Sequence, residues 1–134
     1  MRVPPTGGRL AVLACTPGEQ HALGLSIAAD FLEAAGWEVL ELGGSVPALS
    51  LAELVAEEQP DVVALSTSTP SAVPPVRGTI DLLHALDPAP FVVLGGRVWR
   101  THPAPDGADA VVHGPSELVE LVTEQFPPVP EDLD

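Results

Sequence analysis

Short apolar segments that alternate with helical segments are the feature that most constrains how this chain can fold. The segment Leu10–Cys15 is apolar throughout and is followed by the turn-forming residues Thr16-Pro17-Gly18. Continuous apolar runs of this length are typical of strands that are buried on both faces of a sheet. We therefore predict strands at residues 10–15, 37–42, 61–66, 91–94 and 108–112.

Helical periodicity occupies the intervals between these segments. Residues 22–35 are predicted to form a helix, because bulky side chains recur there at helical spacing. We expect these side chains on the buried face, and they are Leu23, Ile27, Phe31 and Leu32. Ser50 and Glu53 have the spacing of a capping box, which predicts the start of a second helix over 51–58. Two more helices are predicted around 73–83 and 115–126.

Strands that alternate with helices predict one doubly wound α/β domain of the flavodoxin-like, Rossmann-type class. It should contain a five-stranded parallel sheet with helices on both faces, in the strand order 2-1-3-4-5. We expect the domain to span residues 9–126, with a flexible N-terminus at 1–8 and an acidic, proline-rich tail at 127–134. Ligands of such folds bind beyond the carboxyl ends of the strands, so the following loops are where a site is expected.

The charge balance limits the partners of this chain. Nineteen acidic residues against five basic ones give a formal net charge of -14, which should repel nucleic acid and anionic membrane surfaces. No apolar run is long enough to span a membrane, and no secretory signal is recognisable at the N-terminus. The single cysteine, Cys15, excludes redox chemistry by a cysteine pair and agrees with a cytoplasmic location.

The loop after the first strand combines an imidazole and a carboxylate. Glu19 and His21 lie two residues apart, and Gly24 follows on the first helical turn. An imidazole is a good axial metal ligand, and a nearby carboxylate can fix its tautomer and raise its basicity. On spacing alone, an exposed histidine in a loop leading into a helix is the better interpretation.

This segment resembles the Asp-x-His-x-x-Gly signature of vitamin B12-binding domains, with Glu19, His21 and Gly24 as the matching residues. The resemblance implies that His21 ligates the cobalt of cobalamin from below, after displacing the cofactor's own dimethylbenzimidazole. The nucleotide tail would then enter a slot lined by a serine after the third strand and a Gly-Gly pair after the fourth. These positions correspond to Ser66 and to Gly95-Gly96.

The resemblance extends over residues 9–122 and adds further candidates for contact with the cofactor, namely Gln20, Thr67, Ser68, His113 and Gly114. Thr67 and Ser68 are equally compatible with an ordinary solvated turn. Glutamate in place of aspartate at Glu19, and the absence of a leucine after Ser66, are departures from the commoner pattern. The glutamate variant looks like that of B12-dependent regulators and photoreceptors.

Other residues near the same edge have weaker candidate roles. Arg97 and Arg100 carry the charge needed to meet the phosphate of the cofactor's tail, and Trp99 could lie on the rim of the slot. Trp37 is interpreted as a sheet-packing residue and Cys15 as a small buried one.

The resemblance favours a sensory or regulatory module that binds adenosylcobalamin, methylcobalamin or hydroxocobalamin and catalyses nothing by itself. The alternative is the corrinoid-carrying subunit of a methyltransferase or mutase. In either case we expect a protein partner or a separate helical module over the upper face of the corrinoid, with a homo-oligomer as another possibility. A phosphoacceptor receiver is excluded, because Cys15-Thr16 and Ser66 stand where its acidic residues would be.

Overall fold

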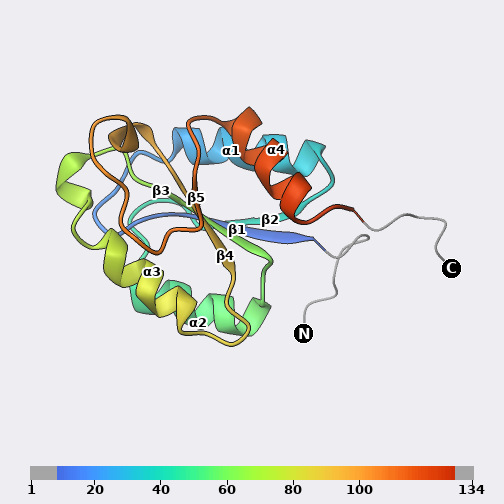
Figure 1. The fold of residues 1–134 in the computed structure, drawn as a ribbon, viewed down its shortest axis with the longest axis horizontal. Helices are drawn as coiled ribbons and strands as arrows, with labels where there is room; N and C mark the ends of the chain where they lie inside the picture. The colour runs from blue at the N-terminus through green and yellow to red at the C-terminus, as the bar shows by residue number, and fades with distance from the viewer. Residues whose placement is uncertain (1–8, 129–134) are drawn as a thin grey trace, which may run out of the picture.

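A five-stranded parallel sheet with the order β2-β1-β3-β4-β5 forms the centre of the computed structural model, which describes residues 9–128 (Figure 1). This is the predicted doubly wound fold. The strands are β1 (Leu10–Cys15), β2 (Glu38–Glu41), β3 (Val62–Ser66), β4 (Phe91–Gly95) and β5 (Ala110–Val111). The N-terminus at 1–8 and most of the tail at 127–134 lie outside the described residues, so the predictions for them stay predictions.

Two helices cover each face of the sheet. The helices α1 (Leu23–Ala34) and α4 (Pro115–Gln125) pack side by side on one face. The helices α2 (Ala48–Glu58) and α3 (Val76–His84) pack together on the other, as the separation above and below the strands in Figure 1 shows. Because both faces are covered, every residue of β1 is buried, as its continuous apolar sequence predicts.

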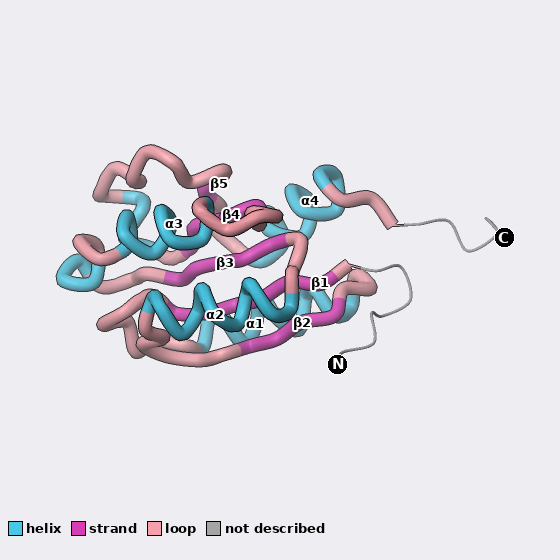
Figure 2. The backbone as a smooth tube through the Cα atoms, turned by 90° about the horizontal axis from the view of Figure 1, so that it is seen from below, coloured by secondary structure: helices cyan, strands magenta, loops and turns pink. Residues whose placement is uncertain are grey.

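Register brings the ends of the central strands together. Cys15 of β1 lies opposite Ser66 of β3, and Ser66 lies opposite Gly95 of β4. The three strands therefore end at nearly the same level. The loops that follow them lie at one edge of the sheet (Figure 2). Two short 3₁₀ helices, η1 (Pro70–Ala72) and η2 (Arg97–Arg100), belong to these loops.

The predicted buried face of α1 is wrong for Leu23, Ile27 and Phe31 and is confirmed for Leu32. The side chains that pack on the sheet are Leu25, Ala29 and Leu32, whereas Leu23, Ile27 and Phe31 are 77%, 42% and 43% exposed. The helix is apolar around most of its circumference, so periodicity could not distinguish the two faces. The small side chain of Ala29 packs on the sheet, whereas the bulkier side chains of Leu23, Ile27 and Phe31 stay exposed.

The predicted start of α2 is also wrong. The helix begins at Ala48 and Pro47 occupies the N-cap position in an extended conformation, without a side-chain capping bond. Ser50 therefore lies inside the first turn, where it cannot act as the cap. The fixed φ of Pro47, which is -61° in the structure, is compatible with that position and starts the helix earlier than the capping-box pattern indicates.

No helix among residues 9–128 combines the length and apolar character needed to cross a bilayer.

Candidate functional site

Glu19 is a buried carboxylate that joins the loop after β1 to the loop after β3. Its side chain is fully buried. The backbone N–H groups of Ser68 and Thr69 donate to Oε1 over 2.6 Å and 2.8 Å, and the N–H of His21 donates to Oε2 over 3.0 Å. One side chain thus satisfies three backbone donors from two loops and fixes their separation.

These contacts determine the ionisation of Glu19. Burial by itself raises the pKa of a carboxyl group, but the hydrogen bonds from Ser68, Thr69 and His21 outweigh that effect and lower the pKa of Glu19 from 4.5 to about 2. The carboxylate is therefore negatively charged near neutral pH.

The ring of His21 is oriented by this carboxylate. Nδ1 lies 2.8 Å from Oε2 of Glu19 and 3.4 Å from Oγ1 of Thr69. A proton on Nδ1 is stabilised by the carboxylate, which leaves the lone pair on Nε2. The ring is 70% exposed, and Nε2 has no hydrogen bond within residues 9–128. His21 therefore presents a free, oriented nitrogen donor to solvent.

A cavity of about 520 Å³ opens beside His21 at the carboxyl edge of the sheet. This volume is within the usual range of small-molecule sites. Its walls are mainly apolar and come from the strands, α1 and α4, with the residues Leu13, Leu25, Ala28, Ala64, Val93, Val112 and Leu118. Its polar rim consists of His21, Ser66, Ser68, Arg97, Arg100 and His113.

Glycines shape this cavity in two ways. Gly96 has φ +111°, and a Cβ there would lie 2.6 Å from the carbonyl carbon of Thr67, so a side chain is excluded by the backbone itself. Gly24 and Gly114 have no atom within 4 Å of the position of a Cβ. Side chains at these two positions would extend into open space, and their absence leaves the cavity accessible.

The structure places most of the predicted contact residues on the cavity wall and three of them elsewhere. The residues on the wall are His21, Gly24, Ser66, Ser68, Gly95, Gly96, His113 and Gly114. Glu19 lies behind the ring of His21, and Gln20 is exposed and lies against Gly44. Thr67 is fully buried, and its hydroxyl pairs with that of Thr16 over 2.6 Å.

Sequence reasoning placed Trp99 on the rim, and that placement is wrong. Trp99 is only 7% exposed, belongs to the core beneath α2 and α3, and donates its ring N–H to the carbonyl of Gly95 over 3.0 Å. Because η2 turns sharply after Gly96, the indole is directed into the core.

The apolar wall of the cavity was not predicted from the sequence. The alternation of side chains along each strand is a signal for this wall, but it identifies the wall only together with the register of the strands. Leu13, Ala64 and Val93 are register partners on β1, β3 and β4 and point to the same face. Alternation along aligned parallel strands would have grouped them, once the register was known. Thr69, which contacts both Glu19 and His21, was considered only as one hydroxyl in a polar loop.

The described residues contain no group of three or more His, Cys, Asp or Glu side chains that could hold a metal ion. A metal ion at His21 would therefore have to bring most of its ligands with it.

Comparisons with known proteins identify related sequences and structures. The family model for the B12 binding domain matches residues 9–122. The chain is 38% identical over 100 residues to the HTH-type transcriptional repressor CarA of Myxococcus xanthus, a match that covers 74% of this chain and 34% of the repressor. It is 31% identical over 113 residues to dimethylamine corrinoid protein 3 of Methanosarcina mazei, covering 80% of this chain and 66% of that protein.

A solved structure shares the fold. A cobalamin-binding protein from Desulfitobacterium hafniense DCB-2 superposes with a TM-score of 0.76 at 30% identity, covering 87% of this chain and 58% of that one. The chain thus spans about a third of the length of the repressor. It spans 66% of the dimethylamine corrinoid protein and 58% of the cobalamin-binding protein.

Proposed function

The chain belongs to the family of B12-binding domains, and from this premise we propose that His21 is the lower axial ligand of cobalt in a sensory or regulatory module. Cobalamin is the cofactor that this family membership assigns to the chain. The observation that carries the proposal is the His21 ring, whose Nδ1 is held by Glu19 at 2.8 Å while Nε2 is free beside the cavity.

The residues present fit a corrinoid. A corrin ring supplies four nitrogen ligands to its cobalt, so a single protein donor such as His21 suffices. The open space beside Gly24 and Gly114 accommodates a large ligand at the rim. The apolar cavity beneath is of the right kind for the planar base of the nucleotide tail. Bound as adenosylcobalamin or methylcobalamin, the cofactor would supply a cobalt–carbon bond that light or a methyl acceptor can break.

The chain's own residues orient and tune that cofactor. Glu19 keeps the proton on Nδ1 of His21 and thereby increases electron donation from Nε2. The hydrogen bonds from Ser68 and Thr69 prevent the carboxylate from moving, so the ring keeps one orientation in the absence of ligand. The binding geometry is therefore largely preorganised.

A regulatory role is supported by the relative with higher identity. The repressor CarA is 38% identical to this chain, and Glu19 departs from the aspartate of the commoner signature. A carrier subunit is the second candidate, because the match to dimethylamine corrinoid protein 3 covers a larger share of that protein, 66% against 34%. In either role we propose that a partner polypeptide covers the upper face of the corrinoid.

The test is an ultraviolet-visible titration of the purified chain with hydroxocobalamin, methylcobalamin and adenosylcobalamin in the dark. We expect the base-off/His-on spectrum with the unmodified chain and its loss with His21→Ala. His84→Ala is the matched control, since His84 also pairs with a carboxylate but lies on α3. A His-on spectrum that persists in His21→Ala would contradict the assignment of the ligand.

The regulatory role is tested on the same complexes after illumination. A regulator should change its oligomeric state or its affinity for a partner when the adenosyl group is released, which size-exclusion chromatography measures. A carrier should instead pass the methyl group of methylcobalamin to an acceptor without a change in assembly.

A further inference from the structure

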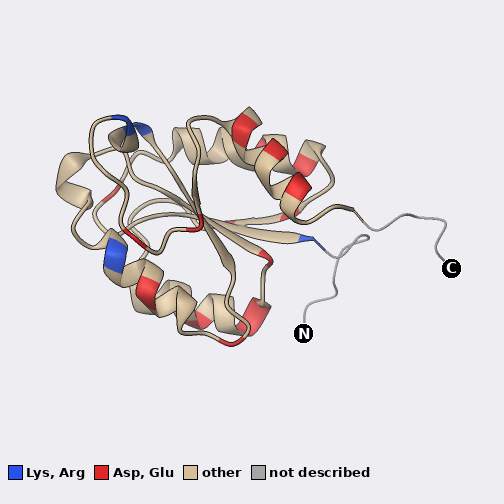
Figure 3. Cartoon of the chain, viewed as in Figure 1, with Lys and Arg blue, Asp and Glu red and all other residues tan. Residues whose placement is uncertain are grey.

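The charged side chains that line the cavity have the opposite sign to the net charge of the chain. The chain has nineteen acidic and five basic residues, yet the cavity wall contains no carboxylate and includes two of the basic residues, Arg97 and Arg100. Figure 3 shows basic residues at η2, while acidic residues are spread along the helices. An excess of positive charge at this one place indicates an anionic ligand group.

We propose that Arg97 and Arg100 bind the phosphodiester of the corrinoid's nucleotide tail and so make the site selective for corrinoids that carry this phosphate. The inference rests on the proposed function and adds a specificity determinant to it. Guanidinium groups form paired, charge-assisted hydrogen bonds with phosphate oxygens.

The backbone explains why both arginines reach the rim. Gly96 adopts a positive φ that turns the chain sharply after β4, and η2 follows directly. Val98 and Trp99 are buried in the core, which anchors η2 from below. Arg97 and Arg100 flank these anchors, and both are exposed where they line the cavity.

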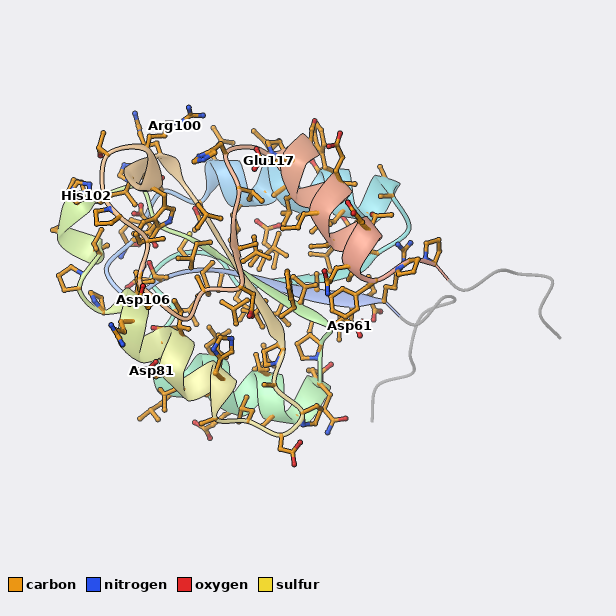
Figure 4. The ribbon with its side chains drawn as sticks, in the orientation of Figure 1. Asp61, Asp81, Arg100, His102, Asp106 and Glu117 are labelled. Carbon is orange, nitrogen blue, oxygen red and sulfur yellow. The ribbon has the colours of Figure 1, made fainter. Side chains whose placement is uncertain are left out.

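Arg100 also links η2 to the opposite side of the opening. Its Nη2 donates to the carbonyl oxygen of His113, in the loop between β5 and α4, over 3.4 Å. Figure 4 shows Arg100 at the same end of the molecule as Glu117, in the first turn of α4. Glu117 is exposed and does not line the cavity.

The start of α4 adds to the positive field. Gly114 and Pro115, its N-cap and first residue, line the cavity, and the N-cap forms no side-chain capping bond. The N-terminal end of a helix carries a partial positive charge that favours anions, and Glu117 in the first turn offsets part of that charge. The two arginines and this helix end therefore surround one side of the opening.

The position of the rim relative to the cavity matches a nucleotide. The interior is apolar and suits a planar base, whereas the arginines lie at the mouth, where a phosphate linking that base to the corrin ring would pass. Cobinamide has the same ring without this phosphate and base, and cobinamide phosphate has the phosphate alone. These compounds separate the contribution of the phosphate from that of the base.

The experiment measures dissociation constants for diaquacobinamide and diaquacobinamide phosphate by calorimetry and by absorbance. Neither compound has a base that must leave cobalt first. The proteins are the unmodified chain, the double variant Arg97→Gln/Arg100→Gln, and Arg77→Gln as the control with an equal charge change per site. Arg77 is exposed on α3 and does not line the cavity.

We expect the unmodified chain and Arg77→Gln to bind the phosphate compound about tenfold more tightly than cobinamide, as for exposed charge-assisted bonds. The double variant should bind both compounds equally, with its affinity for cobinamide retained. The preference of the unmodified chain should also decrease with added salt.

The outcomes separate this inference from the proposed function. Equal binding of both compounds by the unmodified chain, or a preference that survives in the double variant, would overturn the role of the arginines while leaving cobalt ligation intact. Failure of the unmodified chain to bind any of the corrinoids, cobalamin included, would overturn both.

Discussion

Two histidine–carboxylate pairs lie at opposite edges of the sheet, and they differ in which ring nitrogen of the histidine is bonded to the carboxylate. At the carboxyl edge, Glu19 holds Nδ1 of His21, and Nε2 is unbonded within the described residues. At the other edge, Nε2 of His84 lies 3.0 Å from Oδ2 of Asp109, and that ring is only 31% exposed. Asp109 also accepts the N–H of Val92 over 2.7 Å.

Cavity volume does not distinguish the two pairs. His21 lines a cavity of about 520 Å³ and His84 lines one of about 510 Å³. The two sites differ in whether Nε2 of the histidine is bonded and in the sign of the charged side chains that line the cavity. The outer nitrogen of His84 is already bonded, and its cavity contains the acidic residues Asp61 and Asp109, whereas the first cavity contains arginines. A site for an anionic, metal-containing ligand is thus recognised by its free donor and by its charge.

The largest expected difference between the pairs is in stability. Glu19→Ala leaves three backbone donors without their acceptor and should lower the free energy of unfolding by about 3 to 5 kcal/mol. Asp109→Ala removes one backbone acceptor and one histidine contact and should lower it by about 1 to 2 kcal/mol. Urea denaturation of the ligand-free proteins measures both values. Equal losses would show that the two carboxylates have the same structural role.

The pH dependence of stability is the second test. The folded pKa of Glu19, about 2, lies below the value of 4.5 for a free carboxyl group. The stabilisation is therefore fully present above pH 4.5 and is lost as the pH falls toward 2, with a total of at most about 3 kcal/mol.

Glu19→Gln is the comparison for this acid titration, because the amide keeps the shape of the side chain and does not ionise. Its unfolding free energy should fall less between pH 4.5 and 2 than that of the unmodified chain. Denaturant titrations at each pH give the two curves, and parallel curves would mean that Glu19 makes no contribution to the acid sensitivity.

Cobalamin affinity should also differ between variants of the two pairs, with a smaller change in free energy than the loss of stability in Glu19→Ala. Glu19→Gln removes the charge that holds the proton on Nδ1 of His21, and we expect cobalamin affinity to fall about 10- to 100-fold. His84→Ala should leave it unchanged. Spectroscopic titration measures both, and an equal loss in the two variants would mean that binding follows global stability and not ligation.

The smallest expected effect concerns Cys15, which lies below the His21 loop. Burial, with added repulsion from Glu19 and Glu41, raises the pKa of the Cys15 thiol to about 11. We expect negligible reaction with a disulfide reagent at pH 8 in the native state and complete reaction after unfolding. Rapid native labelling would show that the carboxyl edge opens in solution.

The sequence predicted the arrangement of strands better than the orientation of individual side chains. The range of β1 follows from an apolar run that a sheet with two covered faces can bury. The strand order follows from the alternation of strands with helices. Spacing alone favours an exposed loop histidine, and it is the resemblance to the B12-binding signature that predicts the pairing of Glu19 with His21. The structure brings these two side chains together.

Tertiary packing determines the side-chain orientations that the sequence pattern does not predict. An apolar stripe exists on both sides of α1, and only contact with the sheet selects Leu25 over Leu23. Thr67 faces Thr16 in the interior because of the twist and register of neighbouring strands, which a linear pattern does not contain. The donors from Ser68 and Thr69 to Glu19 are contacts between distant segments that no local motif reports.

We expect the exposed apolar side chains of α1 to affect how copies of this chain approach one another in solution. A net charge of -14 makes two copies repel at low ionic strength. Dissolved salt shortens the range of that repulsion to about 10 Å at 0.1 M. Leu23, Ile27 and Phe31 are then able to approach their counterparts on a second copy, and salts such as sulfate strengthen that apolar contact. We therefore expect the second virial coefficient of the ligand-free chain to decrease as salt is added.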